Sequence, residues 1–298
     1  MLTVTIQQDR VQIGRHFAVT FERTLRIPDD GRTYPLPPSL GHFPIRRVED
    51  HRDRVPAGWL EHGGVFIPMY QREAMWLNFH AAHWRPNALK VAVGKVNALS
   101  GETYQPRLKP TEQDYVVTPP QPWLDGINAG AGYIKQFVAM PLGSGTTIEG
   151  QITGEEVHGG LQLVCFEPKP GRFPEQPPAI PREFAIAACA PAAACAGGAA
   201  EMGLAAGGRM RQQIYPDPHG IDTWDQDNYG RVFVHIVNSA DWTRITGEPL
   251  PSTPVDVHSY IDAGLPWFDL YDDHLGDIEP SGALAKVKSV DEVVDGVW

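Results

Sequence analysis

The segment Gln121–Glu167, QPWLDGINAGAGYIKQFVAMPLGSGTTIEGQITGEEVHGGLQLVCFE, decides the fold class that this sequence predicts. It contains three apolar runs, which are Tyr133–Met140, Thr146–Ile152 and Leu161–Phe166. Each run is rich in Val, Ile, Leu, Phe or Thr, a composition that favours strands over helices. The breaks at Gly143–Gly145 and His158–Gly160 permit tight turns, because glycine adopts positive φ without steric cost. We therefore predict a β-meander whose inner face is the core of a first domain.

Six further segments before this one also have the pattern of short strands, and Gly or Pro residues separate them. They are Leu2–Ile6, Phe17–Phe21, Val65–Pro68, Met75–Phe79, Asn87–Ala98 and Asp114–Thr118. Many short strands of this kind are typical of a sandwich or a barrel. The sequence thus predicts a mainly β protein, with a sandwich-like or barrel-like N-terminal domain over residues 1–167.

The composition changes after this first unit. Six prolines occur between Pro168 and Pro181, and Ala185–Ala200 is almost entirely Ala, Cys and Gly. Neither stretch has a periodic apolar face that could offset its ordering entropy, so residues 168–200 are predicted to be a linker. Residues 201–298 are predicted to form a smaller α+β domain. Its expected elements are a glycine-weakened helix over Glu201–Tyr215, a strand over Arg231–Val237, helices over Asp241–Thr246 and Val255–Ala263, an aromatic segment over Leu265–Tyr271 and a short amphipathic tail over Leu284–Val297.

Charge and hydropathy exclude several classes of partner. The chain of 298 residues has a net charge of −11, with scattered Lys and Arg. Nucleic acids and anionic membrane surfaces both require clustered basic residues, so neither is expected as a partner. No run of about 18 apolar residues occurs, and the first ten residues lack a signal segment, so no membrane span is expected.

Three cysteines are too few for a disulfide framework, which favours a reducing compartment and a cytoplasmic location. Cys165 lies in an expected strand, where a thiol acts as a small apolar group. Cys189 and Cys195 could pair or bind a metal, but the sequence places no other ligand near them.

The densest group of candidate ligand-binding residues lies in Tyr215–Tyr229, YPDPHGIDTWDQDNY. The candidates are Asp217, His219, Asp222, Trp224, Asp225 and Asp227. Three of the carboxylates could supply oxygen ligands to calcium, although the spacing does not match an EF-hand loop. Trp224 could instead stack on a sugar whose hydroxyls the Asp side chains bind. The third interpretation, and the more common one for Asp clusters, is that these side chains cap turns and helix starts.

His80 and His83 form an H-x-x-H pair in NFHAAHW. On a helix they would share a face and could bind zinc with His62 or Glu73. The preceding run reads as a strand, however, which would place them on opposite faces, so surface loop histidines are expected instead.

No nucleophile or cofactor motif stands out elsewhere. Gly143–Gly145 lacks the G-x-S-x-G elbow, and Gly203–Gly208 lacks the lysine of a phosphate-binding loop. Arg209 and Arg211 could hold an anion, although a solvated helix end is more common. We predict no cofactor, with calcium as the one candidate ion, and no catalytic residue can be assigned.

Several long phrases, including GVFIPMYQREAMWLNF, LKVAVGKVNALSGE, QFVAMPLGSG and MGLAAGGRMRQQIYPDPHG, give the chain a family resemblance. It resembles a two-part family of bacterial proteins, some of which are labelled "integral membrane protein-like", a label that the hydropathy of this sequence does not support. The resemblance implies the two-part layout and no particular activity.

Two functional classes follow from these patterns. The first is a soluble, non-enzymatic binding or assembly protein that uses its β-surfaces to hold a protein or carbohydrate ligand, or a second copy of itself. The alternative is a hydrolase, metal-assisted or not, with its acid and base in the Asp217–Asp227 cluster.

Overall fold

One large, mostly antiparallel sheet dominates the structure, a computed structural model that describes residues 1–177, 201–250, 253, 272 and 274–294. Its strands are β1 (Val4–Gln7), β2 (Arg10–Ile13), β3 (Phe17–Thr24), β4 (Thr33–Tyr34), β5 (Arg46–Arg47), β6 (Val65–Met69), β7 (Ala74–Ala81), β8 (Asn87–Val93), β9 (Val96–Asn97), β10 (Val116–Thr118), β11 (Trp123–Leu124), β12 (Gly126–Gly130), β13 (Tyr133–Pro141), β14 (Leu161–Pro168), β15 (Glu201–Arg211) and β16 (Trp224–Asn238). The mainly β fold class that the sequence predicts is confirmed.

Short helices connect and flank these strands. They are α1 (Ala57–His62), α2 (Ile148–Thr153), α3 (Trp242–Thr246), α5 (Gly282–Ala285) and α6 (Val290–Val294), with 3-10 turns at Glu49–His51, Ile221–Thr223 and Ser239–Asp241. The expected helix at Asp241–Thr246 is confirmed as α3. No helix among the described residues is long and apolar enough to cross a bilayer.

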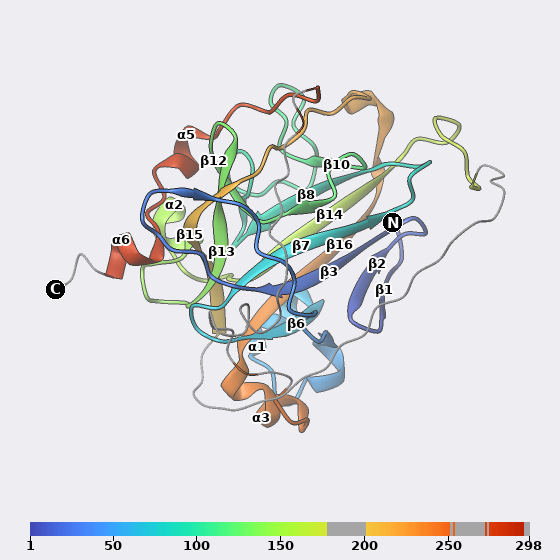
Figure 1. The fold of residues 1–298 in the computed structure, drawn as a ribbon. Coiled ribbons are helices and arrows are strands. Elements are labelled where there is room, and N and C mark those ends of the chain that lie inside the picture. The colour runs from blue at the N-terminus through green and yellow to red at the C-terminus, as the bar shows by residue number, and fades with distance from the viewer. Residues whose placement is uncertain (178–200, 251–252, 254–271, 273, 295–298) are drawn as a thin grey trace.

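The order of strands along the sheet is β1-β2-β3-β7-β13-β15-β16-β14-β8-β10 (Figure 1). Strands from the second half of the chain, β15 and β16, therefore lie between strands from the first half. β15 pairs with β13, and β16 pairs with β14 and, in parallel, with β6. The predicted division into a domain over residues 1–167 and a separate domain over residues 201–298 is not confirmed, because backbone hydrogen bonds cross it at the centre of the sheet.

The predicted meander is wrong in two respects. Two of its expected strands, now β13 and β14, are not neighbours, since β15 and β16 separate them. The third, Thr146–Ile152, forms helix α2 instead of a strand. The hydroxyl of Thr147 accepts a hydrogen bond from the amide of Gly150, and Gly154 ends the helix in the left-handed conformation. These two caps stabilise a helix that the β-branched composition obscured.

The predicted helix over Glu201–Tyr215 is also wrong, because this segment contains strand β15. Its glycines serve close packing in the sheet. A Cβ atom at Gly208 would lie 2.3 Å from the carbonyl oxygen of Pro28, so only glycine fits there. Paired glycines disfavour a helix and here allow another backbone to approach the strand.

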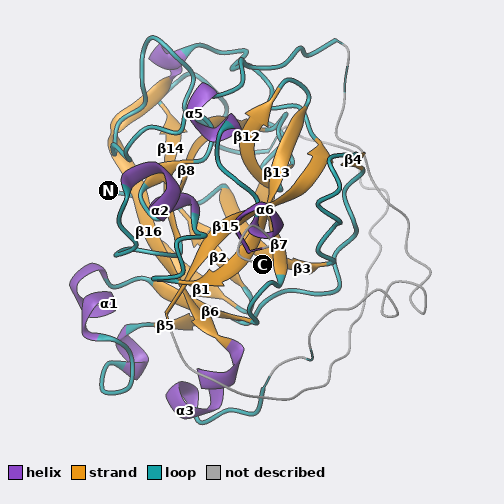
Figure 2. Ribbon diagram, turned by 90° about the vertical axis from the view of Figure 1, so that its left-hand side faces the viewer, coloured by secondary structure: helices purple, strands orange, loops and turns teal. Residues whose placement is uncertain are grey.

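The main core lies against this sheet and contains side chains from almost every long strand, such as Phe21, Leu77, Phe137, Leu163 and Ile236. A smaller cluster joins α1 and α3 to β6 and β16 through Trp59, Phe66, Val237, Trp242 and Ile245. Figure 2 shows these two helices together near β5 and β6. Helix α6 packs on β13 and β15 through Val290.

Several predictions fall outside the described residues. They are the central part of the linker from residue 178 onward, the thiols Cys189 and Cys195, the helix Val255–Ala263 and the aromatic segment Leu265–Tyr271.

Candidate functional site

The Asp217–Asp227 cluster lies on the approach to β16 and at the start of that strand, and the half-buried carboxylate of Asp217 holds a turn. One oxygen of Asp217 accepts hydrogen bonds from the Tyr115 hydroxyl and the Trp224 indole, both at 2.8 Å. The other oxygen accepts the amide of His219 at 2.8 Å. Trp224 is only 1% exposed, so its ring face is not available for stacking on a sugar. These contacts occupy both oxygens of Asp217 within the fold.

The remaining carboxylates of this cluster are half-buried Asp225 and exposed Asp222 and Asp227. Asp225 accepts the amides of Asp227 and Asn228 at 3.1 and 3.2 Å, as turn-capping side chains do. Asp227 pairs with Arg107 at 2.8 Å on the surface. Asp222 and His219 are exposed. In the described part of the chain, no group of three His, Cys, Asp or Glu side chains has a geometry that could hold a metal ion.

The residues that were considered for zinc lie on separate elements. His80 is on β7, His62 ends α1, and His83 is exposed beside the ring of Trp84. Glu73 is buried and paired with Arg23 at 2.5 Å. His80 is not the loop histidine that the sequence suggested, because it lies within a strand and is half-buried.

A pocket of about 520 Å³ opens where β2, β3 and β7 end together, and we call it the arginine pocket. It is lined by Arg10, Gln12, Arg15, His16, Ala18, Phe79, His80, Ala81, Ala82 and Trp84. The β2–β3 hairpin builds one wall, and its turn contains Gly14 at φ +66, where another residue would be strained. Gln12 ties the hairpin together by donating to the carbonyls of Gly14 and Phe17 at 3.1 and 2.8 Å.

The charge of the arginine pocket is entirely positive. Both Arg10 and Arg15 line it, no carboxylate does, and neither guanidinium forms an ion pair with any residue that the structure describes. Two ring nitrogens of the lining, Nε2 of His16 and Nε1 of Trp84, are buried without a hydrogen-bond partner in the described structure. Both arginines are exposed, and one carboxylate lies next to the pocket, because Oε1 of Glu167 accepts the backbone amide of Arg15 at 3.3 Å while Glu167 pairs with Arg85.

His80 connects the arginine pocket to a buried carboxylate. Its Nε2 lies 3.0 Å from the hydroxyl of Thr20, which donates its own proton to Glu22 at 2.5 Å. Because the Thr20 proton is used in that bond, Nε2 of His80 must be the donor to Thr20. Burial, followed by the positive charge of Arg10, lowers the pKa of His80.

Glu22 is the centre of this network and is 1% exposed. Its second oxygen accepts the hydroxyl of Ser39 at 2.5 Å and Nδ1 of His42 at 2.9 Å. Burial alone would raise the pKa of Glu22, but the hydrogen bonds from His42, Ser39 and Thr20 outweigh it and hold that pKa below its usual value. The same hydrogen bond from His42 to Glu22 raises the pKa of His42.

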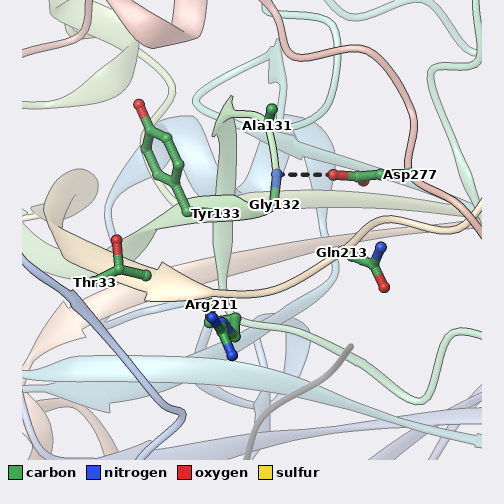
Figure 3. A pocket seen from close by; sticks show the side chains of 7 residues that line it. All are labelled: Thr33, Ala131, Gly132, Tyr133, Arg211, Gln213 and Asp277. Atoms are coloured by element: carbon green, nitrogen blue, oxygen red, sulfur yellow. Dashed lines mark hydrogen bonds between the residues drawn. The ribbon is translucent and has the colours of Figure 1, made fainter. Parts of the chain in front are cut away.

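A second pocket, of about 470 Å³, lies at the turn between β12 and β13 (Figure 3). The carboxylate of Asp277 forms part of its lining and accepts the amides of Gly132 at 2.9 Å and Ile214 at 2.8 Å, and burial raises its pKa. Arg211 lies at the opposite wall from Ala131 and has contacts of its own. Since the one carboxylate here already binds backbone amides, this second pocket offers a ligand fewer unused groups than the arginine pocket does.

Sequence reasoning identified His80 but missed Arg10, Arg15, Glu22 and His42. The available signal was in β3, where Thr20 and Glu22 occupy one phase of the strand and Val19 and Phe21 the other. Comparison with known proteins adds no further evidence, since no family model, no curated protein and no solved structure matches the chain.

Proposed function

We propose that this protein binds a small anionic ligand, through a phosphate or carboxylate group, in the arginine pocket. The observation that carries the proposal is the pair of guanidinium groups, Arg10 and Arg15, that line one pocket with no carboxylate among its other residues. Guanidinium groups present paired N–H donors whose geometry matches the oxygens of phosphate and carboxylate.

The remaining lining residues support the same ligand chemistry. His16 and Trp84 each have a buried ring nitrogen that lacks a partner in the described structure, and such a group gains free energy when a ligand oxygen or a bound water satisfies it. The aromatic faces of Phe79 and Trp84 suit an apolar or ring-containing part of the ligand. The pocket volume of about 520 Å³ lies within the range of small-molecule sites.

Neither of the sequence-based functions that rely on residues 217–227 gains support from the contacts there. Both oxygens of Asp217 and one oxygen of Asp225 are engaged in the fold, and Trp224 is buried. The binding class of function is therefore retained, with its site moved from the Asp cluster to the β2–β3–β7 region.

Isothermal titration of the full chain with inorganic phosphate at low ionic strength tests this proposal. Arg10→Ala and Arg15→Ala should each weaken binding by about 10-fold or more, the usual loss for a hydrogen-bonded charge. Arg32→Ala is the matched control, because it removes the same charge from an exposed loop next to β4, where the side chain is 81% exposed. Equal affinities for all four proteins, or no heat of binding in the wild type, would rule out the arginine pocket as an anion site.

A further inference from the structure

The pair Glu22–His42 has the geometry by which enzymes orient a basic imidazole. The ionised, buried carboxylate accepts the Nδ1 proton of His42 at 2.9 Å. The other ring nitrogen, Nε2, therefore carries the lone pair in the neutral imidazole. The His42 side chain is 48% exposed, whereas that of Glu22 is 1% exposed. A fixed carboxylate thus faces the inner nitrogen of a ring that is half open to solvent.

The main chain around His42 is held as firmly as its ring. Residues Glu22 and His42 form an antiparallel bridge. The amide of Arg23 donates to Gly41 at 2.9 Å, and the amide of Phe43 donates to Phe21 at 2.8 Å. An imidazole that is fixed at both its backbone and its Nδ1 loses little entropy when it reacts.

His42 lies close enough to Arg10, a lining residue of the arginine pocket, for the charge of Arg10 to affect the pKa of His42. Residues 41–43 flank one half of β3, and β2, which carries Arg10, flanks the other half. The charge of Arg10 acts on both His42 and His80. Through Thr20, Glu22 contacts His80, a lining residue of the pocket. One buried carboxylate is thus linked through Thr20 to an imidazole that lines the arginine pocket, and directly to a second imidazole, His42, which is not among the lining residues.

We propose that His42, positioned by Glu22, is the general base of a hydrolytic site that acts on a carboxylic ester whose anionic group is bound by Arg10. Nε2 of His42 takes a proton from water as the water oxygen bonds to the ester carbonyl carbon. The tetrahedral oxyanion then collapses, the bond from carbon to the alkoxy oxygen breaks, and the leaving alkoxide takes the proton from His42. The products are one acid and one alcohol, and no redox partner is required.

Water is the nucleophile because the nearby hydroxyls are already engaged. Thr20 and Ser39 both donate their protons to Glu22, at 2.5 Å each. Glu22 is a positioning residue in this scheme, since it touches His42 and not the substrate. The inference rests on the proposed anion site and adds a chemical step to it.

Acetate release from 4-acetoxybenzoate, an anionic ester, and from phenyl acetate, its uncharged counterpart, tests this step in the full chain. We expect the wild type to prefer the anionic ester, and His42→Gln to lose about 100-fold or more in kcat, the usual contribution of a general base. His274→Gln, at an exposed position outside both pockets, is the control. The rate should rise with pH through a value above the ordinary histidine pKa, because the hydrogen bond to Glu22 raises the pKa of His42 by more than burial lowers it. The charges of Glu22 and Asp9 raise this pKa further, that of Arg10 lowers it, and His80 is a second titratable group whose charge interacts with that of His42.

The variant Glu22→Gln distinguishes a catalytic role of the pair from a structural one, because a purely structural role would leave the pH–rate profile unchanged. Glu22→Gln keeps the shape of the side chain but removes its charge, so it should move the pH–rate profile toward lower pH as well as slow the reaction. His42→Gln alone carries the test if Glu22→Gln does not fold, because His42 is half exposed. Full activity in His42→Gln, or no acetate release by a wild type that still binds phosphate, would overturn the catalytic step and leave the binding proposal standing. His42-dependent release without phosphate binding would instead remove the arginine pocket from the scheme, and with it the assignment of Arg10.

Discussion

His80 of β7 lies directly opposite Ala18 of β3. This pairing decides the shape of the arginine pocket, because the methyl group of Ala18 leaves room beside the imidazole, and both residues line the cavity. The neighbouring pair on the same face is Thr20 opposite Asn78, which brings the Thr20 hydroxyl within reach of His80. A slip of one residue between these strands would turn all of these side chains to the other face.

Ala18→Val should therefore weaken anion binding while the protein stays folded. The branched side chain suits a strand but occupies pocket volume, and overpacking at this buried position should cost about 1–3 kcal/mol of the free energy of unfolding. Titration with inorganic phosphate, together with urea unfolding, measures both effects. Unchanged phosphate affinity in a folded variant would show that the ligand does not enter beside Ala18.

Asp125 should make the protein less stable as the pH rises. Its carboxyl group is completely buried beside the indole of Trp123, and neither oxygen has a hydrogen bond in the described structure. Burial raises the pKa of this carboxyl group well above the usual value. The native state therefore keeps a proton that the unfolded state releases above pH about 3.9. In that window the group lowers the free energy of unfolding by up to about 1.4 kcal/mol per pH unit, until the folded pKa is reached.

Asp125→Asn removes this dependence, since the amide has the same shape and does not ionise. We expect its urea-unfolding free energy to fall less between pH 5 and pH 8 than that of the wild type, and to exceed it at pH 8. Asp222→Asn, at an exposed position, serves as the control and should follow the wild type. Parallel stability curves for Asp125→Asn and wild type would contradict the buried, protonated carboxyl.

Two members of the Asp cluster, Asp217 and Asp222, should respond very differently to truncation. Asp217→Ala leaves the Tyr115 hydroxyl and the Trp224 indole without an acceptor, which should cost about 1–3 kcal/mol of the free energy of unfolding. Asp222→Ala removes an exposed side chain and should change stability by less than about 0.5 kcal/mol. Chemical denaturation measures both values. A larger loss for Asp222→Ala, with stabilisation of the wild type by calcium, would restore the metal interpretation.

A substitution at Gly208 tests the close contact between β15 and Pro28. Gly208→Ala places a Cβ atom 2.3 Å from the Pro28 carbonyl oxygen, which forces backbone to move and should destabilise the fold by about 1–3 kcal/mol. Gly282→Ala is the matched control, because nothing lies within 4 Å of its added Cβ and alanine is the better helix former in α5. Equal thermal stability of the two variants would argue against the close contact between β15 and residue 28.

The existence of most strands could be predicted, because local composition determines it. The order of the strands in the sheet could not be predicted. Val and Ile in Tyr133–Met140 and Leu161–Phe166 indicate strands whatever lies beside them. The insertion of β15 and β16 between those strands depends on contacts across the whole chain, which no local pattern encodes. The Thr147 cap and the close contact at Gly208 reversed two local preferences, turning one predicted strand into a helix and one predicted helix into a strand.

The candidate site was harder to predict than the fold. Its residues come from β2, β3, β7 and the connection that contains Ser39, and only the strand register brings them together. The sequence indicated His80 as a candidate metal ligand together with His83, but in the structure its hydrogen-bond partner is Thr20 and not a second histidine. The Asp cluster was a candidate because many Asp residues occur close together in the sequence. Turn-forming segments share this property with metal sites.

The imidazole ¹H–¹⁵N NMR spectrum of the full chain, recorded near pH 6.5 with and without sodium sulfate, tests the anion site most directly. Sulfate does not titrate in this range, and His80→Asn identifies the His80 signals. We predict that sulfate moves His80 toward its protonated form, since a bound anion opposes the lowering of its pKa by burial and Arg10, while exposed His274 stays unchanged. Sulfate-independent His80 signals, or equal shifts at His80 and His274, would contradict anion binding in the arginine pocket.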